Sequence, residues 1–459
     1  MFIINWDDIE GRINPNSFRN VFLFNSKVFE KVKLGKVVVL NPTINFSKLS
    51  NEDNVSFIPM EIIDEHYGIV KENKTKKCSE ITGFTKFKEG DLLWAKITPC
   101  MQNGKSAIAE NLINGLGCGS TEFFVIRPRD NKILIKYIHF ILRDKRVLKN
   151  AENYFGGSAG QQRVSKDYLL NLQIPLPPLS LQQQIIDIMD IVYTKKQEYE
   201  QQANELLDSI DSYLLNELGI VMPVEEENTL KSRMFSMSSS EVLSGRFDPY
   251  YYKKSFIENL NNIQNGKCGW QKLIYFSIGG LVKGTLPNDK QKNGKYEVVQ
   301  IKCIDKGGMI DLSDVLTAKE IFTTEQKLMN GDVLIVITGA TIGKIALWEY
   351  DDEYYLGGDI VKFNTGNHYL NEIYAALLRT KPYQMQIKRC ITGATNGHLA
   401  LFDIEKLPMP NISDEKFQIK IANNINATRK KAKRLEQQAD DIIRDAKAKV
   451  EKILLEGNL

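Results

Sequence analysis

The chain has 459 residues, of which 42% are hydrophobic and 25% are charged, a balance typical of a soluble protein with two to three domains. Its net charge of +3 is too small to indicate a polyanionic partner, although a local basic stripe is still compatible with it. No apolar run approaches the roughly 20 residues that span a bilayer. The N-terminus, "MFIINWDDIEGR", lacks a signal-peptide pattern, so the expected location is the cytoplasm.

Cysteine and histidine usage indicates neither a disulfide framework nor a metal centre. The six cysteines include no Cys-x-x-Cys pair, and the four histidines are far apart in the sequence. Zinc sites and disulfide-rich domains both depend on characteristic ligand spacings. We therefore expect no metal ion and no cofactor.

The first part of the chain contains short strand-like runs followed by helices. The runs "KVVVL", "DLLWAKI" and "TEFFVI" are rich in β-branched or aromatic residues and are separated by Gly, Asn, Asp and Pro. A helical stretch, "KYIHFILRDKRVLKN", a Gly-rich loop and a Pro-rich segment come next. Pro177, Pro178 and Ser180 then begin a long helix, and Gly219 ends it.

The rest of the chain repeats this order. Its strands are "KYEVVQI", "DVLIVIT" and "DIVKFN", its shorter helical stretch is "LNEIYAALLRTKPYQMQIK", and Ser413 is the candidate N-cap of a second long helix. The prediction is an α+β fold with two β-rich modules, over 1–180 and 221–412, each followed by a long helix, over 181–220 and 413–459.

Matching residues indicate two tandem copies of one module. The corresponding residues are Gly90-Asp91 with Gly331-Asp332, Gly104-Lys105 with Gly343-Lys344, and, at a constant shift of 235 positions, Pro175 with Pro410 and Gln183 with Gln418. A period this long is not that of a solenoid.

The two long helices each carry an apolar stripe. Apolar residues recur at steps of three and four from Ile185 to Leu218 and from Phe417 to Ile453. Each helix is about 60 Å long at ~1.5 Å per residue. A module of about 150 residues has a radius of gyration of only about 15 Å. We therefore expect the helices to pair as a coiled coil; the alternative is that each packs on its own module.

The stretch "ITGATIGKIALWE", 337–349, is similar to a phosphate-binding loop but fails its pattern. That loop needs G-x-x-x-x-G-K-[ST]. Gly339 and Gly343 are one residue too close, and Ile345 replaces the hydroxyl; in the other copy Pro99 replaces the first glycine. A turn between two strands, with Gly at positive φ, is the simpler interpretation. A third interpretation is that the turn and its lysine face a nucleic-acid backbone.

Catalytic signatures are also incomplete. The stretch "RFDPYYY", 246–252, resembles the [DNS]-P-P-[YF] loop of adenine methyltransferases, but it has one proline and no Gly-rich methyl-donor loop accompanies it. No carboxylates stand at a spacing that indicates a metal or general-acid pair. We therefore predict no catalytic residues.

Four stretches carry a family resemblance: "FIPMEIIDEHYGIV" (57–70), "GFTKFKEGDLLWAKITPCMQNGKSAI" (83–108), "NGDVLIVITGATIGKIAL" (330–347) and "TGATNGHLALFDIEKLPMP" (392–410). With the order of parts, they make nearly the whole chain similar to the specificity (S) subunit of type I restriction-modification enzymes. The segment "LPMPNISDEKFQIKI" departs from its counterpart "LPPLSLQQQII". Unequal partner contacts by the two copies are therefore expected.

The resemblance implies a non-catalytic DNA-recognition subunit. In that family, each module is a target-recognition domain that reads one half of a bipartite sequence in double-stranded DNA. The two helices pack antiparallel and set the gap between the half-sites. Adenine methyltransferase (M) subunits bind around the helices, a motor-nuclease (R) subunit completes the restriction enzyme, and no membrane is involved.

A DNA reader needs cations for phosphates and amide or basic side chains for base edges. Loops of the two copies supply such side chains, and the candidate DNA-binding residues are Lys96, Thr98, Gln102, Lys105, Gln161, Gln162, Arg163, Thr338, Thr341, Lys344, Asn396 and His398. For each, a solvated loop residue is the alternative, and the division between base readers and phosphate contacts is left open. Because the loops differ, two unlike half-sites are expected.

Two further features lie on the long helices. The run "RKKAKR", 429–434, is interpreted as a solvated helix face, with DNA phosphates or an acidic partner as alternatives. Five glutamines are candidate methyltransferase contacts: Gln182, Gln183, Gln184, Gln201 and Gln202.

Three rival functions remain open at this point. One is an enzyme, such as a fused methyltransferase-nuclease, which would bind S-adenosylmethionine. Another is a coiled-coil scaffold without DNA binding, which would show no salt-dependent affinity for a duplex. The third is a specificity subunit of a system that methylates without restricting.

Overall fold

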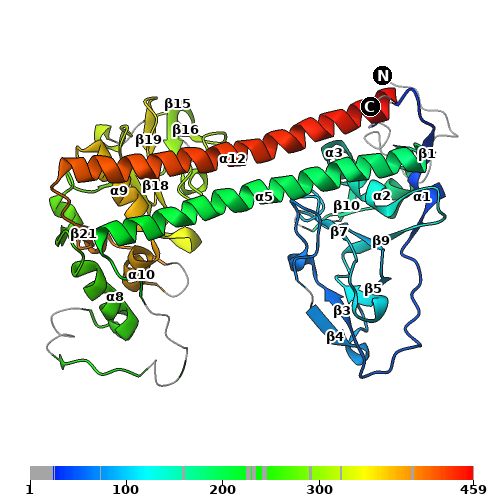
Figure 1. The fold of residues 1–459 in the computed structure, drawn as a ribbon, viewed down its shortest axis with the longest axis horizontal. Helices are drawn as coiled ribbons and strands as arrows, with labels where there is room; N and C mark the ends of the chain where they lie inside the picture. The colour runs from blue at the N-terminus through cyan, green and yellow to red at the C-terminus, as the bar shows by residue number, and fades with distance from the viewer. Residues whose placement is uncertain are drawn as a thin grey trace. The chain divides into compact units, whose positions relative to one another are not determined.

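Figure 1 shows the fold in a computed structural model. The structure describes residues 24, 26–72, 74–157, 161–223, 229, 234–239, 246–288, 292–305, 307–320, 323–393 and 397–457. The chain divides into two compact units: Met1–Tyr199 together with Gln437–Leu459, and Glu200–Glu436.

The first unit contains two four-stranded sheets. One has the order β2-β9-β6-β7 and is antiparallel; the other has the order β4-β3-β8-β5, in which β3 and β8 run parallel. The strands are β2 Val38–Leu40, β3 Asn54–Ile58, β4 Lys74–Lys77, β5 Thr85–Lys88, β6 Leu92–Ala95, β7 Ser106–Ile108, β8 Leu116–Gly119 and β9 Phe123–Pro128.

The second unit repeats this arrangement. Its antiparallel sheet has the order β14-β20-β17-β18, and its second sheet has the order β16-β15-β19 with β15 and β19 parallel. The strands are β14 Val282–Lys283, β15 Lys292–Val299, β16 Leu316–Ala318, β17 Val333–Val336, β18 Ile345–Leu347, β19 Tyr354–Leu356 and β20 Ile360–Phe363. The repeat in the sequence is therefore a repeat in structure, and the predicted strands are confirmed.

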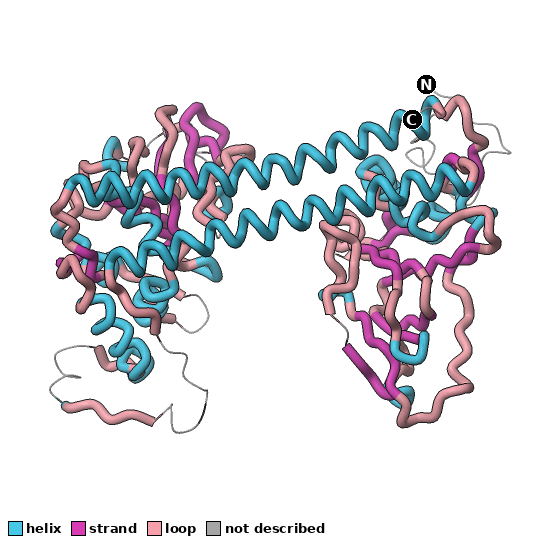
Figure 2. Tube along the Cα trace, in the orientation of Figure 1, coloured by secondary structure: helices cyan, strands magenta, loops and turns pink. Residues whose placement is uncertain are grey.

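Two-stranded ladders and helices complete each unit (Figure 2). The ladders are β1 Lys31–Lys33 with β12 Gln173–Pro175, β10 Phe155–Gly156 with β11 Arg163–Val164, and β13 Trp270–Lys272 with β21 Pro408–Pro410. The shorter helices are α1 Leu34–Val37, α2 Ile135–Leu142, α3 Lys145–Ala151, α4 Lys166–Asn171, α8 Lys254–Gln264, α9 His368–Arg379, α10 Lys381–Cys390 and α11 Leu401–Glu405.

Each predicted shorter helical stretch is in fact a pair of helices. In the first unit, Asp144 separates α2 from α3, because its side chain accepts a hydrogen bond from Arg146 N at 2.8 Å and caps the new helix. In the second unit, Thr380 precedes α10, which has a proline in its first turn. A capping side chain therefore divides the first stretch, and a proline in the first turn of α10 marks the division of the second.

The repeated Gly-Asp pair forms the same turn in both copies. Gly90 has φ +80° and Gly331 has φ +94°, values that favour glycine. The next carboxylates, Asp91 and Asp332, are almost fully buried and accept hydrogen bonds from backbone N–H groups of Lys88 and Met329 at 2.8 and 2.9 Å. Each pairs with a cation from a neighbouring strand, at 2.6 Å to Arg127 and 2.8 Å to Lys362.

The Pro-rich segments that precede the two long helices are held to the modules by tyrosine side chains. Tyr137 and Tyr374 donate hydrogen bonds to the carbonyls of Pro175 and Pro410 at 2.9 and 2.8 Å. These prolines belong to β12 and β21, so the constant shift that pairs them in sequence also pairs them in structure.

One correspondence from the sequence is wrong by a residue. Gln418 is buried, and its amide binds Ile412 O at 2.6 Å and Asn367 Nδ2 at 2.9 Å. The buried counterpart in the first copy is Gln182, which binds Pro177 O at 2.8 Å, whereas Gln183 is exposed. Gln182 is 0% exposed, so it is also unsuited to the partner contact predicted for it.

The long helices are α5 Leu179–Leu218 and α12 Glu415–Glu456, and they pack antiparallel within each unit (Figures 1 and 2). In the first unit, Ile185 and Met189 at the start of α5 share a core with Val450 and Ile453 at the end of α12. In the second unit, the end of α5 packs with the start of α12.

The core of the second unit contains the opposite ends of the two long helices. There, Ile210 and Leu214 near the end of α5 share a core with Ile421 and Ile425 near the start of α12. Lys420 of α12 also pairs with Glu217 of α5 at 2.8 Å. The predicted antiparallel coiled coil is confirmed, and the same apolar residues also pack on the modules.

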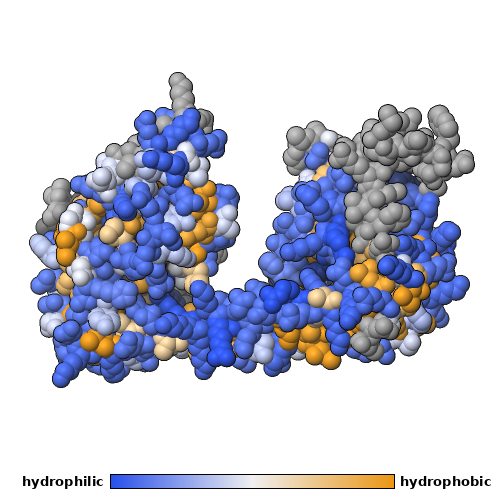
Figure 3. Space-filling model, turned by 90° about the horizontal axis from the view of Figure 1, so that it is seen from above, coloured by the Kyte–Doolittle hydropathy of each residue, from blue (hydrophilic) through white to orange (hydrophobic). Residues whose placement is uncertain are grey.

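Among the described residues, no helix is both long enough and apolar enough to cross a membrane. Figure 3 shows mostly hydrophilic side chains on the face that it displays, with hydrophobic patches between them.

The predicted solvated face on α12 is confirmed except at its first residue. Lys430, Lys431, Lys433 and Arg434 are exposed. Arg429 is not: burial lowers its pKa, and Glu372 of α9 opposes that shift.

Glu372 is a buried carboxylate in the second unit. It is 0% exposed; its Oε2 accepts a hydrogen bond from Asn426 Nδ2 at 2.6 Å, and its Oε1 has no hydrogen-bond partner among the described residues. Burial raises its pKa from 4.5 to about 7, although Arg429 acts in the opposite direction. The folded state therefore prefers the protonated acid.

Replacing this acid should stabilise the protein at alkaline pH. A raised carboxyl pKa contributes stability that is complete below the unfolded pKa and is lost as pH rises through the folded pKa. Glu372→Gln should therefore match the wild type near pH 5 and exceed it at pH 8 by about 1–3 kcal/mol. Urea unfolding at both pH values measures this. The exposed Glu415→Gln is the control, and an equal effect of Glu372→Gln at pH 5 and pH 8 would contradict the assignment.

Candidate nucleic-acid interface

In the first unit, two segments that both carry candidate residues meet beyond the end of β6. Thr98 N donates to Gln162 O at 3.0 Å, and Gln162 N donates to Thr98 Oγ1 at 3.2 Å. Val164 N donates to Lys96 O at 2.9 Å, and Ile97 forms a β-bridge with Arg163. The structure therefore brings Lys96, Thr98, Gln162 and Arg163 together.

The second unit contains the same meeting of segments. Leu399 N donates to Ile337 O at 2.9 Å, and Gly339 N donates to Gly397 O at 3.2 Å. Thr338 forms a β-bridge with His398, as Ile97 does with Arg163. His398 and Arg163 therefore stand at equivalent positions in the two copies. Asn396 lies outside the described residues.

A bidentate ion pair distinguishes the first copy. Arg163 Nε and Nη2 donate to the two Glu122 carboxylate oxygens at 2.9 and 2.8 Å, and this bond lowers the Glu122 pKa. Lys96 lies near the same carboxylate and 5.5 Å from the centroid of the Phe124 ring. The pair fixes the direction of the guanidinium while leaving it partly accessible.

The second copy carries different side chains at the equivalent backbone positions. Ile337 N donates to Asp359 O at 2.9 Å, just as Lys96 N donates to Glu122 O at 2.9 Å. The same backbone thus carries Lys96 in one copy and Ile337 in the other. Asp359, which stands where the first copy has Glu122, has φ +66°.

The two Gly-Lys turns are confirmed as strand connections with glycine at positive φ. Gly104 has φ +74° and Gly343 has φ +87°. The lysine ammonium groups donate to backbone carbonyls: Lys105 Nζ to Met60 O at 3.3 Å, and Lys344 Nζ to Ile304 O at 2.6 Å. Lys105 thereby ties its turn to the 3₁₀ helix Met60–Ile62. Lys344 ties its turn to Ile304, which directly follows the 3₁₀ helix Ile301–Cys303.

Gln161 and Thr341 flank the joined segments, with Gln161 O accepting a hydrogen bond from Arg163 Nη1 at 3.2 Å, and Gln102 lies apart from them. Gln102 is exposed and donates to Glu152 Oε1 at 3.2 Å, and Gln161 is exposed. Thr341 ends the 3₁₀ turn Gly339–Thr341.

A family model for the type I restriction modification DNA specificity domain matches residues 26–208 and 270–451. The chain belongs to this family.

The chain is also similar to individual specificity subunits. The chain is 30% identical to the specificity subunit of the type I restriction enzyme EcoAI from Escherichia coli, over 57% of this chain and 42% of that subunit. It is 33% identical to the EcoEI specificity subunit from Escherichia coli, over 57% of this chain and 41% of that subunit. The match thus spans about two fifths of each relative. The solved HsdS subunit from Thermoanaerobacter tengcongensis is 15% identical, covering 94% of this chain and 98% of that one, with a TM-score of 0.39.

The described residues contain no group of three or more His, Cys, Asp or Glu side chains that could hold a metal ion. Burial raises the pKa values of the Cys118 and Cys390 thiols to about 11, so both are protonated at neutral pH.

Sequence reasoning missed a lysine-rich surface on the second sheet of the first unit. Lys76 of β4 lies 4.9 Å from the centroid of the Phe57 ring and 5.3 Å from that of Phe84. Lys86 of β5 lies 5.3 Å from the centroid of the Phe46 ring. Neither ammonium pairs with a carboxylate among the described residues. The sequence signal was "KTKK", 74–77, next to "FTKFK".

The second unit has a smaller counterpart of this surface. Lys295 lies 4.7 Å from the centroid of the Tyr296 ring, and Tyr296 packs edge-on against Tyr355 at 5.6 Å between centroids. Aromatic rings beneath cations are a common feature of nucleic-acid-binding surfaces.

The lysines of the Gly-Lys turns should contribute mainly to stability. Lys105→Met and Lys344→Met each remove a charged donor from a backbone carbonyl, at an expected cost of about 1–2 kcal/mol. The loss should be larger for Lys344, whose bond is shorter. Urea unfolding measures both, with the exposed Lys88→Met as control. Unchanged stability together with weaker, less salt-dependent DNA binding would instead identify phosphate contacts.

Proposed function

We propose that the chain is the DNA sequence-specificity subunit of a type I restriction-modification enzyme. Each module reads one half of a bipartite target in double-stranded DNA. The recognition domains are 1–180 and 221–412, and the helices 181–220 and 413–459 serve as the spacer. The subunit itself is non-catalytic and delivers adenine methyltransferase and motor-nuclease subunits to the site.

The observation that supports this function is the double match to the specificity-domain model. Duplicate readers suit a divided target, because two similar frames can each engage a separate patch of one duplex. The equivalent positions carry Arg163 with Glu122 in one copy and His398 in the other. Different side chains present different hydrogen-bonding patterns to base edges, so the half-sites are unlike.

Within each module, we assign roles by accessibility and pairing. Arg163 is the leading base reader of the first copy, because a guanidinium held by a bidentate pair is preorganised for the acceptor edge of guanine. Gln162 and Thr98 adjoin it, and His398 with Thr338 takes this place in the second copy. Lys76 and Lys86 supply phosphate contacts.

The bipartite reading is tested by mapping modified adenines. The full chain is co-expressed with the candidate adenine methyltransferase subunit of its own genome, and methylated positions are read by long-read sequencing. One split motif with unlike halves and a fixed gap is expected. Exchanging residues 1–180 for those of a relative should change one half, and exchanging 221–412 should change the other.

A negative map has a definite meaning in this experiment. If the complex forms and the methyltransferase is competent but no motif appears, the chain is a scaffold rather than a DNA reader. An undivided motif would contradict the two-reader arrangement. Methylation without cleavage, in the presence of every subunit that the genome encodes, would indicate a methylation-only system.

The lysine surface of the first unit predicts a change in salt dependence. Each phosphate contact contributes about 0.9 to the slope of log K against log salt concentration. The double variant Lys76→Gln, Lys86→Gln should therefore lower that slope by about 1.8, with the methylated motif unchanged. Fluorescence anisotropy with a target duplex measures this, and the exposed Lys166→Gln serves as control. An unchanged slope would limit both lysines to covering the phenylalanine rings.

A further inference from the structure

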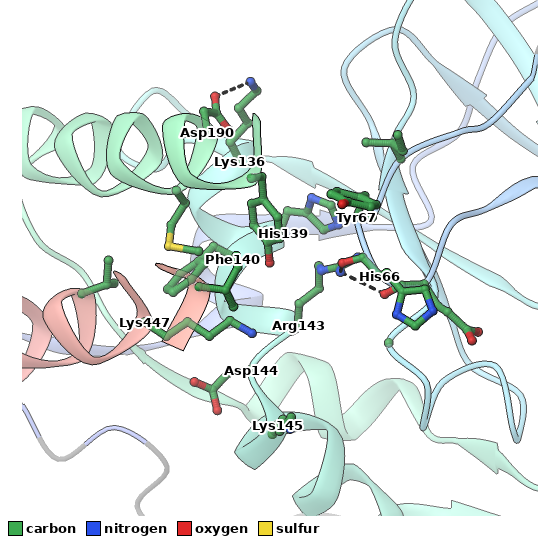
Figure 4. Close-up of a pocket in the computed structure, with 18 of the residues that line it drawn as sticks. His66, Tyr67, Lys136, His139, Phe140, Arg143, Asp144, Lys145, Asp190 and Lys447 are labelled. Atoms are coloured by element: carbon green, nitrogen blue, oxygen red, sulfur yellow. Dashed lines mark hydrogen bonds and ion pairs between the residues drawn. The ribbon is translucent and has the colours of Figure 1, made fainter. Parts of the chain in front are cut away.

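A cavity of about 1140 Å³ opens within the first unit, apart from the joined recognition segments (Figure 4). Its wall comes from the loop 65–70, from α2 and the start of α3, and from stretches of α5 and α12. Tyr67 and Tyr193 contribute aromatic surface, with their rings packed edge-on at 6.2 Å between centroids. Cavities of this size accommodate small organic ligands.

Some of the charged side chains in the wall neutralise one another. Lys136 pairs with Asp190 at 2.9 Å. Arg146 pairs with Asp144 at 2.8 Å and also with Glu451. The acidic groups closest to these cations are therefore already engaged.

A second set of cations forms no direct ion pair with a carboxylate among the described residues. Figure 4 shows Lys447 extending from α12 toward Arg143 and Asp144. Lys447 and Lys145 have no hydrogen-bond or ion-pair partner among the described residues. Burial lowers the Lys447 pKa, and repulsion from Arg143, Lys145 and Lys196 lowers it further, with only Asp144 acting in the opposite direction.

Arg143 and its neighbours add to the positive field. Its Nη2 donates to Glu65 O at 3.0 Å and to His66 O at 2.6 Å, both neutral carbonyls, and its buried Nη1 has no hydrogen-bond partner among the described residues. Burial lowers the pKa of Arg143, and Tyr193 and Asp64 oppose that shift. His139, whose Nε2 lies 3.1 Å from Ser106 Oγ, is held neutral because burial and Arg143 lower its pKa to about 3.

Such an arrangement is unfavourable for the empty fold. Repulsion among Lys447, Lys145 and Arg143 costs free energy, which Asp144 and Asp64 offset only in part and which solvent reduces because Lys145 and Lys447 are exposed. A bound anion would recover it. A tetrahedral phosphate dianion accepts several charge-assisted hydrogen bonds at once, which suits two lysines with a guanidinium behind them better than a single carboxylate does.

We propose that this cavity binds a phosphate group, held by Lys145 and Lys447 with Arg143 behind them. The phosphate belongs either to a small free ligand or to a nucleic-acid backbone. Lys145 and Lys447 come from α3 and α12, so the bound group would join a helix of the module to a long helix of the same unit.

The test uses the full chain and inorganic phosphate as the probe. Isothermal titration with phosphate is compared with sodium chloride and acetate at matched ionic strength. Specific binding of phosphate is expected, and Lys447→Met should weaken it about tenfold, the loss of one charge-assisted hydrogen bond. Lys145→Met should have a similar effect. Lys449→Met, an exposed lysine on the same helix outside the cavity wall, should leave binding unchanged.

Thermal unfolding without phosphate controls for folding. Lys447→Met should keep or raise the melting temperature, because it removes a repelled ammonium. Absence of phosphate binding, equal binding of acetate, or an equal loss with Lys449→Met would overturn the proposal.

Two arms separate the sources of the phosphate. Competition by a short target duplex, with a lower salt slope for Lys447→Met, assigns it to the DNA backbone. Phosphate binding that the duplex leaves unchanged assigns it to a free ligand. The adenine-methylation map is independent of both arms, so the proposal can fail while DNA recognition stands.

Discussion

Burial of the apolar stripes of α5 and α12 is the constraint on which the rest of the structure depends. Each helix has about 40 residues, and a stripe of that length cannot be covered by one small module. Both units meet this constraint in the same way: one end of α5 and the opposite end of α12 complete a module's core. The modules and the helices therefore form one hydrophobic system in each unit.

Buried polar contacts, and not apolar packing alone, stabilise the fold that the two modules share. Asp91 and Asp332 cap the turn before the central strand and bind a cation on the next strand. Because an unpaired buried carboxylate is costly, these contacts fix the strand register in both copies. Side chains on the connecting loops are free of this role, and there the copies diverge.

The charged candidate residues differ in whether their charge is already paired within the fold. Lys105 and Lys344 are committed to backbone carbonyls, whereas Lys76 and Lys86 cover aromatic rings without a carboxylate partner among the described residues. A charge already satisfied within the fold has less free energy to offer a ligand. Residue type and loop position alone do not make this distinction.

The sequence by itself determined the two-copy order, the strands, the long helices and the Gly-Lys turns, because periodicity, turn residues and repetition are local signals. It missed the division of the shorter helical stretches, and it paired Gln183 instead of Gln182 with Gln418. Only the tertiary structure decided that Arg163 and His398 are equivalent, that the Gly-Lys lysines face inward, and that Arg143 and Lys447 share a cavity. These facts depend on contacts between residues far apart in the chain, which no local pattern encodes.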